Sequence, residues 1–91
     1  MAAEVQFESE IHWDGNSLSV WAVNDGARLL CIIPRATIHE VPPFGDAISR
    51  EIARDRSEIL DRLRPALVVK ISRGALGPLE LLPTDLIAGA R

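Results

Sequence analysis

The amino-acid sequence predicts a single small α+β domain: an antiparallel sheet of about four strands, in the order β-β-β-α-α-β, with a short and a long helix packed on one face. Three observations support this class. Residues 18–33 hold two apolar runs of strand length joined by Asp25-Gly26, which is typical of a β-hairpin. Residues 48–71 carry aliphatic side chains near every fourth position, the period of an amphipathic helix. The chain has 91 residues, enough for one modest core.

Composition narrows the classes of partner and compartment. The net charge is −3, and the arginines of residues 50–64 alternate with acidic residues, so we expect neither nucleic acid nor an anionic membrane as a partner. The single cysteine, Cys31, excludes an internal disulfide and suits a reducing compartment. Residues 1–10 lack the apolar stretch of a signal peptide, and no apolar run approaches the ~20 residues that span a bilayer. We therefore expect a cytoplasmic location.

The first predicted strand is short. Residues 4–8 alternate, with Val5 and Phe7 on one side, which indicates a half-buried strand. Residues 12–17 then form a loop around Asp14-Gly15.

The hairpin has a predicted register. A two-residue type I′ turn at Asp25-Gly26 pairs Asn24 with Ala27. One face is then wholly apolar, with Leu18, Val20, Ala22, Leu29, Cys31 and Ile33. The other face carries Ser19, Trp21, Val23, Arg28, Leu30 and Ile32. A three-residue loop would move Arg28 onto the apolar face, so the two-residue register is preferred.

The short helix is expected to begin at Pro34, because the first helical turn does not use the missing N–H. It would bury Ala36, Ile38 and Val41 and end at Pro42-Pro43. Phe44 follows in the connector and is expected to insert into the core.

The long helix is expected to begin at Asp46 as its N-cap. Its apolar stripe consists of Ile48, Ile52, Ile59, Leu63, Leu67 and Ile71. Pro65 interrupts the backbone hydrogen bonding and would kink or end the helix. Residues 67–71 also alternate with period two and are rich in β-branched side chains, which favours a strand. The helical phase of Leu67 and Ile71 leads us to prefer a kinked helix to Arg73, stopped by Gly74.

The end of the chain carries weaker signals. Gly77-Pro78 make a turn, residues 79–82 indicate a last strand, and residues 83–86 begin a final turn.

The order of these signals resembles a family of short, mostly proteobacterial proteins, the domain-of-unknown-function family number fourteen eighty-eight. The matching pieces are Trp13-Asp14, Leu18-x-Val20-x-Ala22, Asp25-Gly26, Leu29-x-Cys31-x-Ile33, Ala36 with Ile38, Arg56-x-x-Ile59, and Leu81-Leu82 to Asp85. The resemblance implies a small α+β fold with an antiparallel sheet and a cysteine at this strand position. It implies no activity. The chain departs from the pattern at Pro34, where a serine-type cap is usual, and at Pro65.

Nucleophilic and metal chemistry have weak candidates. Cys31 with His12 or His39 as base would make a reactive thiol, but a mid-strand position on the apolar face indicates a buried structural cysteine. The pairs His12 with Asp14 and His39 with Glu40 do not match a closed zinc set. We therefore expect no metal, no cofactor and no catalytic residue, and rank an enzyme that uses Cys31 last.

Arg56 is the candidate ligand-binding residue. It projects close to the apolar stripe of the long helix, with Asp55 on the other flank, and guanidinium suits carboxylate and other oxygen ligands. The alternative is a structural ion pair, or an arginine whose stem packs while its charged head reaches water.

The second hairpin face is the candidate interface, through Trp21, Val23, Leu30 and Ile32. If the helices cover only one side of the sheet, this apolar patch stays open, and a second copy is the simplest cover. The alternative is a helix or loop of the same chain on that face. The sequence thus predicts a non-enzymatic interaction or regulatory module that forms a homodimer; a small-molecule or anion binder that uses Arg56 is the second hypothesis.

Overall fold

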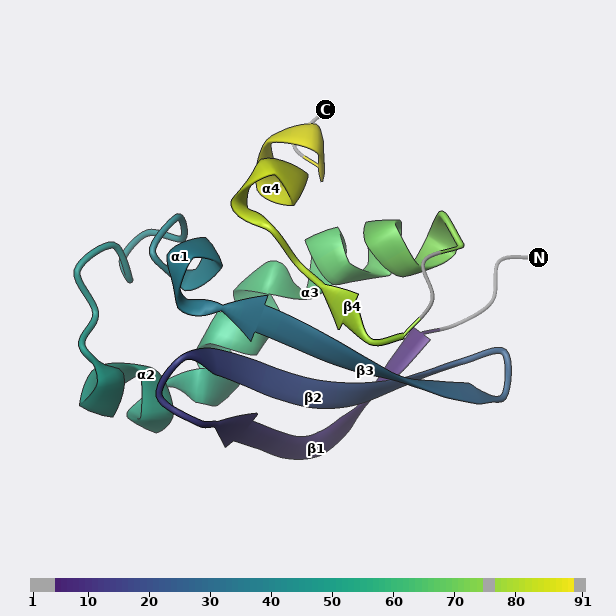
Figure 1. Ribbon diagram of the computed structural model, residues 1–91, viewed down its shortest axis with the longest axis horizontal. Coiled ribbons are helices and arrows are strands. Elements are labelled where there is room, and N and C mark those ends of the chain that lie inside the picture. Colours follow the sequence, from purple (N-terminus) through teal and green to yellow (C-terminus); the bar gives the residue numbers. More distant parts are fainter. Residues whose placement is uncertain (1–4, 75–76, 90–91) are drawn as a thin grey trace.

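The computed structural model describes residues 5–74 and 77–89. It contains strands β1 (Val5–Trp13), β2 (Ser17–Asn24), β3 (Ala27–Pro34) and β4 (Leu79–Glu80), with helices α1 (Arg35–Ile38), α2 (Ser49–Arg54), α3 (Arg56–Ser72) and α4 (Pro83–Gly89). The predicted α+β class is confirmed. In Figure 1, α3 passes behind the three long strands, and within the described residues no helix lies in front of them.

The four strands form one sheet in the order β1-β2-β3-β4. The first three are antiparallel, as predicted, but β4 runs parallel to β3, with Cys31 opposite Leu79 and Ile32 opposite Glu80. The sheet is therefore mixed rather than antiparallel throughout. The helical segment between β3 and β4 acts as a crossover connection, which returns the chain to the same end of the sheet before β4 begins.

The hairpin register is confirmed residue by residue. Val20 lies opposite Cys31, and Leu18 lies opposite Ile33. Asp25 and Gly26 form the loop with φ angles of 55° and 82°, the two positive values that a type I′ turn requires.

Strand β1 is longer than predicted. A bulge interrupts the alternation of side chains from which its length was predicted. Phe7 pairs with Ala22 and Ile11 with Val20, so residues 8–10 all lie opposite Trp21. The polar bulge residues concealed the second half of the strand, which continues to Trp13 rather than becoming a loop at residue 12.

The core lies between the sheet and the helices. On the sheet it uses the inner face of the hairpin, defined by Leu18, Val20, Ala22, Cys31 and Ile33, all of which are buried. The helices contribute Ile52, Ile59, Leu63, Leu67 and Ile71, which are also buried, as the predicted stripe requires. The face without polar members is thus the one that packs against the helices.

The short helix begins one residue later than predicted and ends at Ile38, before the predicted stop at Pro42-Pro43. Pro34 ends β3 and caps α1 rather than opening it. Ile38, Val41 and Phe44 are buried as expected. Ala36 is exposed and Thr37 is buried in its place, because the Thr37 hydroxyl finds a hydrogen-bond acceptor in the interior.

The long helix begins later than predicted and is divided in two. Asp46 is not its N-cap: α2 begins at Ser49, where the Glu51 carboxylate accepts a hydrogen bond from the Ile48 N–H at 3.0 Å. Ile48 is consequently 49% exposed and leaves the predicted stripe. Ala47 is buried instead, in a turn whose N–H reaches the Phe44 carbonyl.

Helix α3 continues through Pro65 to Ser72, and Gly74 follows with a φ of +86°. The helical interpretation of residues 67–71 is therefore confirmed over the strand interpretation. The ribbon of α3 changes direction about midway along its length (Figure 1), as expected of a helix with an internal proline.

The predicted last turn is a helix. α4 begins at Pro83, and its Asp85 carboxylate accepts hydrogen bonds from the Leu82 N–H and from Lys70 Nζ, each at 2.7 Å. Lys70 also donates to the Glu80 carbonyl at 2.7 Å, so one ammonium joins α3, β4 and α4.

Candidate interaction surface

The hairpin side chains that point away from the helices define the outer face: Ser19, Trp21, Val23, Arg28, Leu30 and Ile32. Trp21 is 38% exposed, which is unusual for so large an apolar side chain. Val23, Leu30 and Ile32 are partly buried. The four residues predicted as an interface therefore share one face, with Trp21 the most open of them.

Trp21 is held in place from both neighbouring strands. The guanidinium carbon of Arg28 on β3 lies 4.3 Å from the centroid of the indole ring, a cation–π contact. The Glu8 carboxylate on β1 accepts two hydrogen bonds from this guanidinium, from Nε at 2.8 Å and from Nη2 at 3.1 Å. Because β2 lies between β1 and β3, the ion pair spans three strands over Trp21, and we call these three side chains the Trp21 triad.

Open depressions lie on both sides of Trp21. One, of about 580 Å³, is lined by Glu10, Ile11, His12, Ser19, Trp21, Leu30 and Arg56. The other, of about 320 Å³, is lined by Trp21, Arg28, Leu29, Leu30, Gly77 and Pro78. Trp21 and Leu30 border both, so the indole forms a ridge between two shallow hollows. Such relief suits a protein surface that receives side chains of a partner.

Arg56 reaches this surface from the start of α3, but not as predicted. Its side chain is exposed rather than packed beside the apolar stripe, and Nη1 donates to the Ala53 carbonyl at 2.6 Å. It lines the 580 Å³ depression together with Glu10, and a further depression of about 510 Å³ together with Glu8 and Glu10. These carboxylates repel an anion, so the surroundings of Arg56 disfavour the anion site.

Asp55, the acidic residue beside Arg56 in the sequence, has a different partner. Its carboxylate accepts hydrogen bonds from Arg54 Nε at 3.2 Å and Nη2 at 3.0 Å. These bonds lower the pKa of Asp55. Asp55 and Arg56 therefore do not form a joint site.

Cys31 lies where the sequence placed it, fully buried on the inner face. Burial raises the pKa of its thiol to about 11. Neither histidine is placed to activate it: His12 lies opposite Ser19, on the opposite side of the sheet, and His39 Nε2 lies 3.1 Å from the Ala47 carbonyl oxygen. A neutral thiol packed among aliphatic groups is a structural residue.

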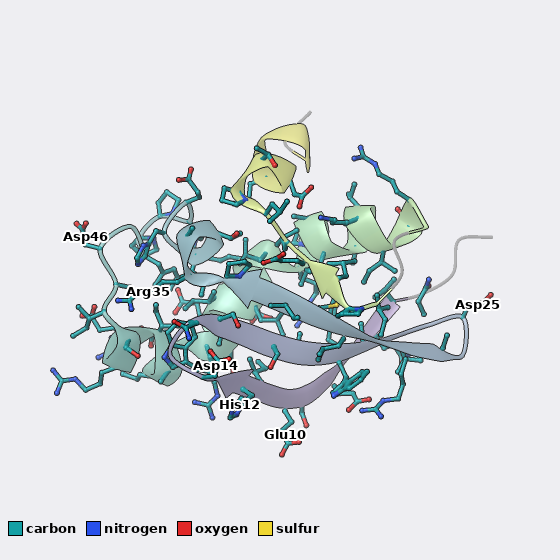
Figure 2. All side chains as sticks on the ribbon, viewed as in Figure 1. Glu10, His12, Asp14, Asp25, Arg35 and Asp46 are labelled. Atoms are coloured by element: carbon teal, nitrogen blue, oxygen red, sulfur yellow. The ribbon has the colours of Figure 1, made fainter. Side chains whose placement is uncertain are left out.

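The polar side chains suggested as metal ligands do not converge. His12 lies at the lower edge of the sheet in Figure 2, whereas Asp14 lies at the turn between β1 and β2. Asp14 instead accepts hydrogen bonds from the N–H groups of Asn16 and Ser17, which lower its pKa. In the other pair, His39 contacts the Ala47 carbonyl through Nε2. Within residues 5–74 and 77–89, no three His, Cys, Asp or Glu side chains are grouped as a metal site would need.

Sequence reasoning missed the parts that Glu8 and Arg28 play. Arg28 was identified only as a polar member of the outer face, and its closeness to Trp21 follows from the hairpin register. Alternation with Phe7 places Glu8 on the outer face, but no sequence pattern indicates that it pairs with Arg28, 20 residues away.

Comparisons with known proteins leave the chain without an assigned relative: no family model, no curated protein and no solved structure matches it. The resemblance to family fourteen eighty-eight stays a prediction. Among the helices of the described residues, none has the length and apolar character needed to cross a bilayer.

Proposed function

We propose that this chain is a non-enzymatic interaction module that self-associates through its outer face, with Trp21 near the centre of the contact. The observation that carries the proposal is the 38% exposure of Trp21 on a sheet face that the described helices leave uncovered. Tryptophan is enriched among the residues that dominate binding energy at protein interfaces. Since Arg28 and Glu8 already hold the ring, binding would order few additional rotamers.

The charges around Trp21 favour a second copy as the partner. Glu10 is negative, Arg28 and Arg56 are positive, and these three border the depressions beside Trp21. The negative Glu8 is paired with Arg28 and lines the neighbouring depression of about 510 Å³. Nucleic acid and anionic membranes select surfaces of positive charge. A surface that carries both signs can instead complement itself, and two-fold dimers use one such self-complementary patch.

Sedimentation velocity across a concentration series tests the proposal. We expect the wild type to sediment as a dimer at high micromolar concentration and Trp21→Glu to sediment as a monomer, because a charge would replace the central apolar anchor. Ile48→Glu is the matched control, since Ile48 is 49% exposed but lies outside the outer face. A monomeric wild type, or a Trp21→Glu variant that dimerises as well as the wild type, would refute self-association.

A small-molecule ligand is the second candidate, because Arg56 and Trp21 line the same depression of about 580 Å³. A ring with a carboxylate could stack on the indole and bind the guanidinium. Glu10 lines the same depression and repels that carboxylate, which makes this the weaker candidate. Benzoate then serves as the probe: thermal stabilisation of the wild type that Arg56→Ala abolishes would support this function. Equal stabilisation of both proteins would exclude a role for Arg56.

A further inference from the structure

We infer that the Glu8–Arg28 pair sets the orientation of the dimer and its choice of partner, so that the Glu8 side of one copy lies over the Arg28 side of the other. The inference rests on the proposed self-association and specifies how the two copies are oriented relative to each other. It concerns two residues that are exposed beside Trp21, with 38% of the Glu8 side chain and 54% of the Arg28 side chain accessible.

The strand order gives the two charges fixed sides of the outer face. Glu8 comes from β1 and Arg28 from β3, with Trp21 of β2 between these strands. The negative end of the pair therefore lies on the β1 side of the outer face, and the positive end lies on the β3 side. The pair is a fixed dipole across the centre of the proposed contact.

Two sheets that pack face to face are related by a two-fold axis in the plane between them. If that axis runs parallel to the strands, β1 of one copy lies over β3 of the other, and Glu8 faces the partner's Arg28. If it runs across the strands, β1 lies over β1, and carboxylate faces carboxylate. Like charges directly opposed at an interface weaken association strongly, so the dipole selects the axis parallel to the strands.

Association along the sheet edge is a competing arrangement that β1 resists. β1 is the outer strand of the described sheet, but Glu8, Ser9 and Glu10 form its bulge. Bulges and charged side chains are the features by which edge strands avoid pairing with another chain. Glu8, the first residue of this bulge, is also the partner of Arg28, so one residue contributes both to the protected edge and to the charge of the outer face.

Charge reversal tests the inference directly. Glu8→Arg makes both members of the pair positive, and Arg28→Glu makes both negative. We expect each variant alone to dimerise at least about tenfold more weakly than the wild type. An equimolar mixture should form a heterodimer with a Kd near that of the wild type, because an all-positive face then meets an all-negative one. Native mass spectrometry of copies with different mass tags counts homodimers and heterodimers.

The control pair is Glu58 and Arg62 on α3, which form an exposed ion pair at 3.4 Å, apart from the outer face. Glu58→Arg and Arg62→Glu should dimerise like the wild type, alone and mixed. The neutral variants Glu8→Gln and Arg28→Gln provide a second readout. Each removes the charge pair, so the dimerisation Kd of each variant should change less with salt concentration than the Kd of the wild type does.

The outcomes separate the two claims. A wild type that dimerises, with reversal variants that dimerise equally well alone or fail to pair when mixed, overturns the role of Glu8 and Arg28 and leaves self-association standing. A wild type that stays monomeric overturns self-association, and this inference with it. Preferential heterodimers from the mixture support both.

Discussion

Thr37 donates a hydrogen bond from Oγ1 to the carbonyl oxygen of Leu81 at 2.6 Å, and both residues are fully buried. The Leu81 N–H in turn donates to the Ile32 carbonyl at 2.8 Å. The backbone of Leu81 is thereby held on one side by β3 and on the other by α1. This contact secures the C-terminal segment after β4, a strand of only two residues.

Thr37→Val should lower the free energy of unfolding by about 1–3 kcal/mol, because the Leu81 carbonyl would stay buried without its donor. Valine keeps the shape of threonine, so the change isolates the hydroxyl. Urea unfolding followed by circular dichroism measures the loss. Thr37→Ser, which keeps a hydroxyl, should cost less, and an unfolding midpoint for Thr37→Val equal to that of the wild type would show that the hydrogen bond contributes nothing.

The Cys31 thiol should react slowly with a thiol reagent in the native protein and fast in denaturant, since the side chain is buried. Cys31→Ser places a hydroxyl in this apolar site and should cost about 1–3 kcal/mol. Native labelling at the denatured rate would contradict the buried placement.

The same thiol predicts a dependence of stability on alkaline pH. The pKa of Cys31 is about 11 in the folded protein, against an ordinary value of 9.0. A group whose folded pKa is raised stabilises the fold fully below the ordinary value and loses that contribution as the pH rises through the folded value. The stability of the wild type should therefore fall between these two values more steeply than that of Cys31→Ala. Parallel curves for the two proteins would argue against the raised pKa.

Pro65→Ala should raise the free energy of unfolding by on the order of 1–3 kcal/mol, because alanine restores a backbone N–H within α3 and removes the clash of the proline ring with the Asp61 carbonyl. Thermal and urea unfolding measure the gain. Arg64→Ala, an exposed neighbour in the same helix, restores no such bond and serves as the control. A less stable Pro65→Ala would mean that the rigidity of proline in the unfolded chain matters more.

The Lys70–Asp85 contact should make the attachment of α4 sensitive to acid. Burial opposes ionisation of Asp85, but hydrogen bonds from Lys70 and Leu82 and the charges of Lys70 and Arg73 outweigh it and lower its pKa below 3.8. A depressed pKa stabilises the fold above the ordinary value and loses that contribution as the pH falls through the folded value.

Asp85→Asn should therefore be less stable than the wild type by roughly 1 kcal/mol near neutral pH, and the difference should shrink below the ordinary pKa of aspartate. Urea unfolding at neutral and at acidic pH measures this. Asp61→Asn, which changes an exposed partner of Arg64, is the control. A difference between Asp85→Asn and the wild type that does not change with pH would assign the effect to packing rather than to charge.

Local chemistry determined the hairpin and the long helix from the sequence alone. Asp25-Gly26 adopt the positive φ angles that the turn needs, and this one turn sets every pairing from Asn24 to Leu18. The apolar period of Ile59, Leu63 and Leu67 predicted a helix through Pro65, because burying one continuous stripe outweighs the lost hydrogen bond. The burial of Cys31 and the exposure of Trp21 follow from the same register, since side chains alternate between the two faces.

The tertiary structure decided what depends on contacts between distant segments. The parallel pairing of β4 with β3 and the burial of Thr37 in place of Ala36 both follow from where the polypeptide returns after the crossover. The Trp21 triad belongs to this group as well. Glu8 and Arg28 are 20 residues apart, and they meet because β1 and β3 lie on either side of β2 in the sheet. Register and period are local properties that a sequence pattern displays, whereas the meeting of two side chains across three strands exists only once the sheet has formed.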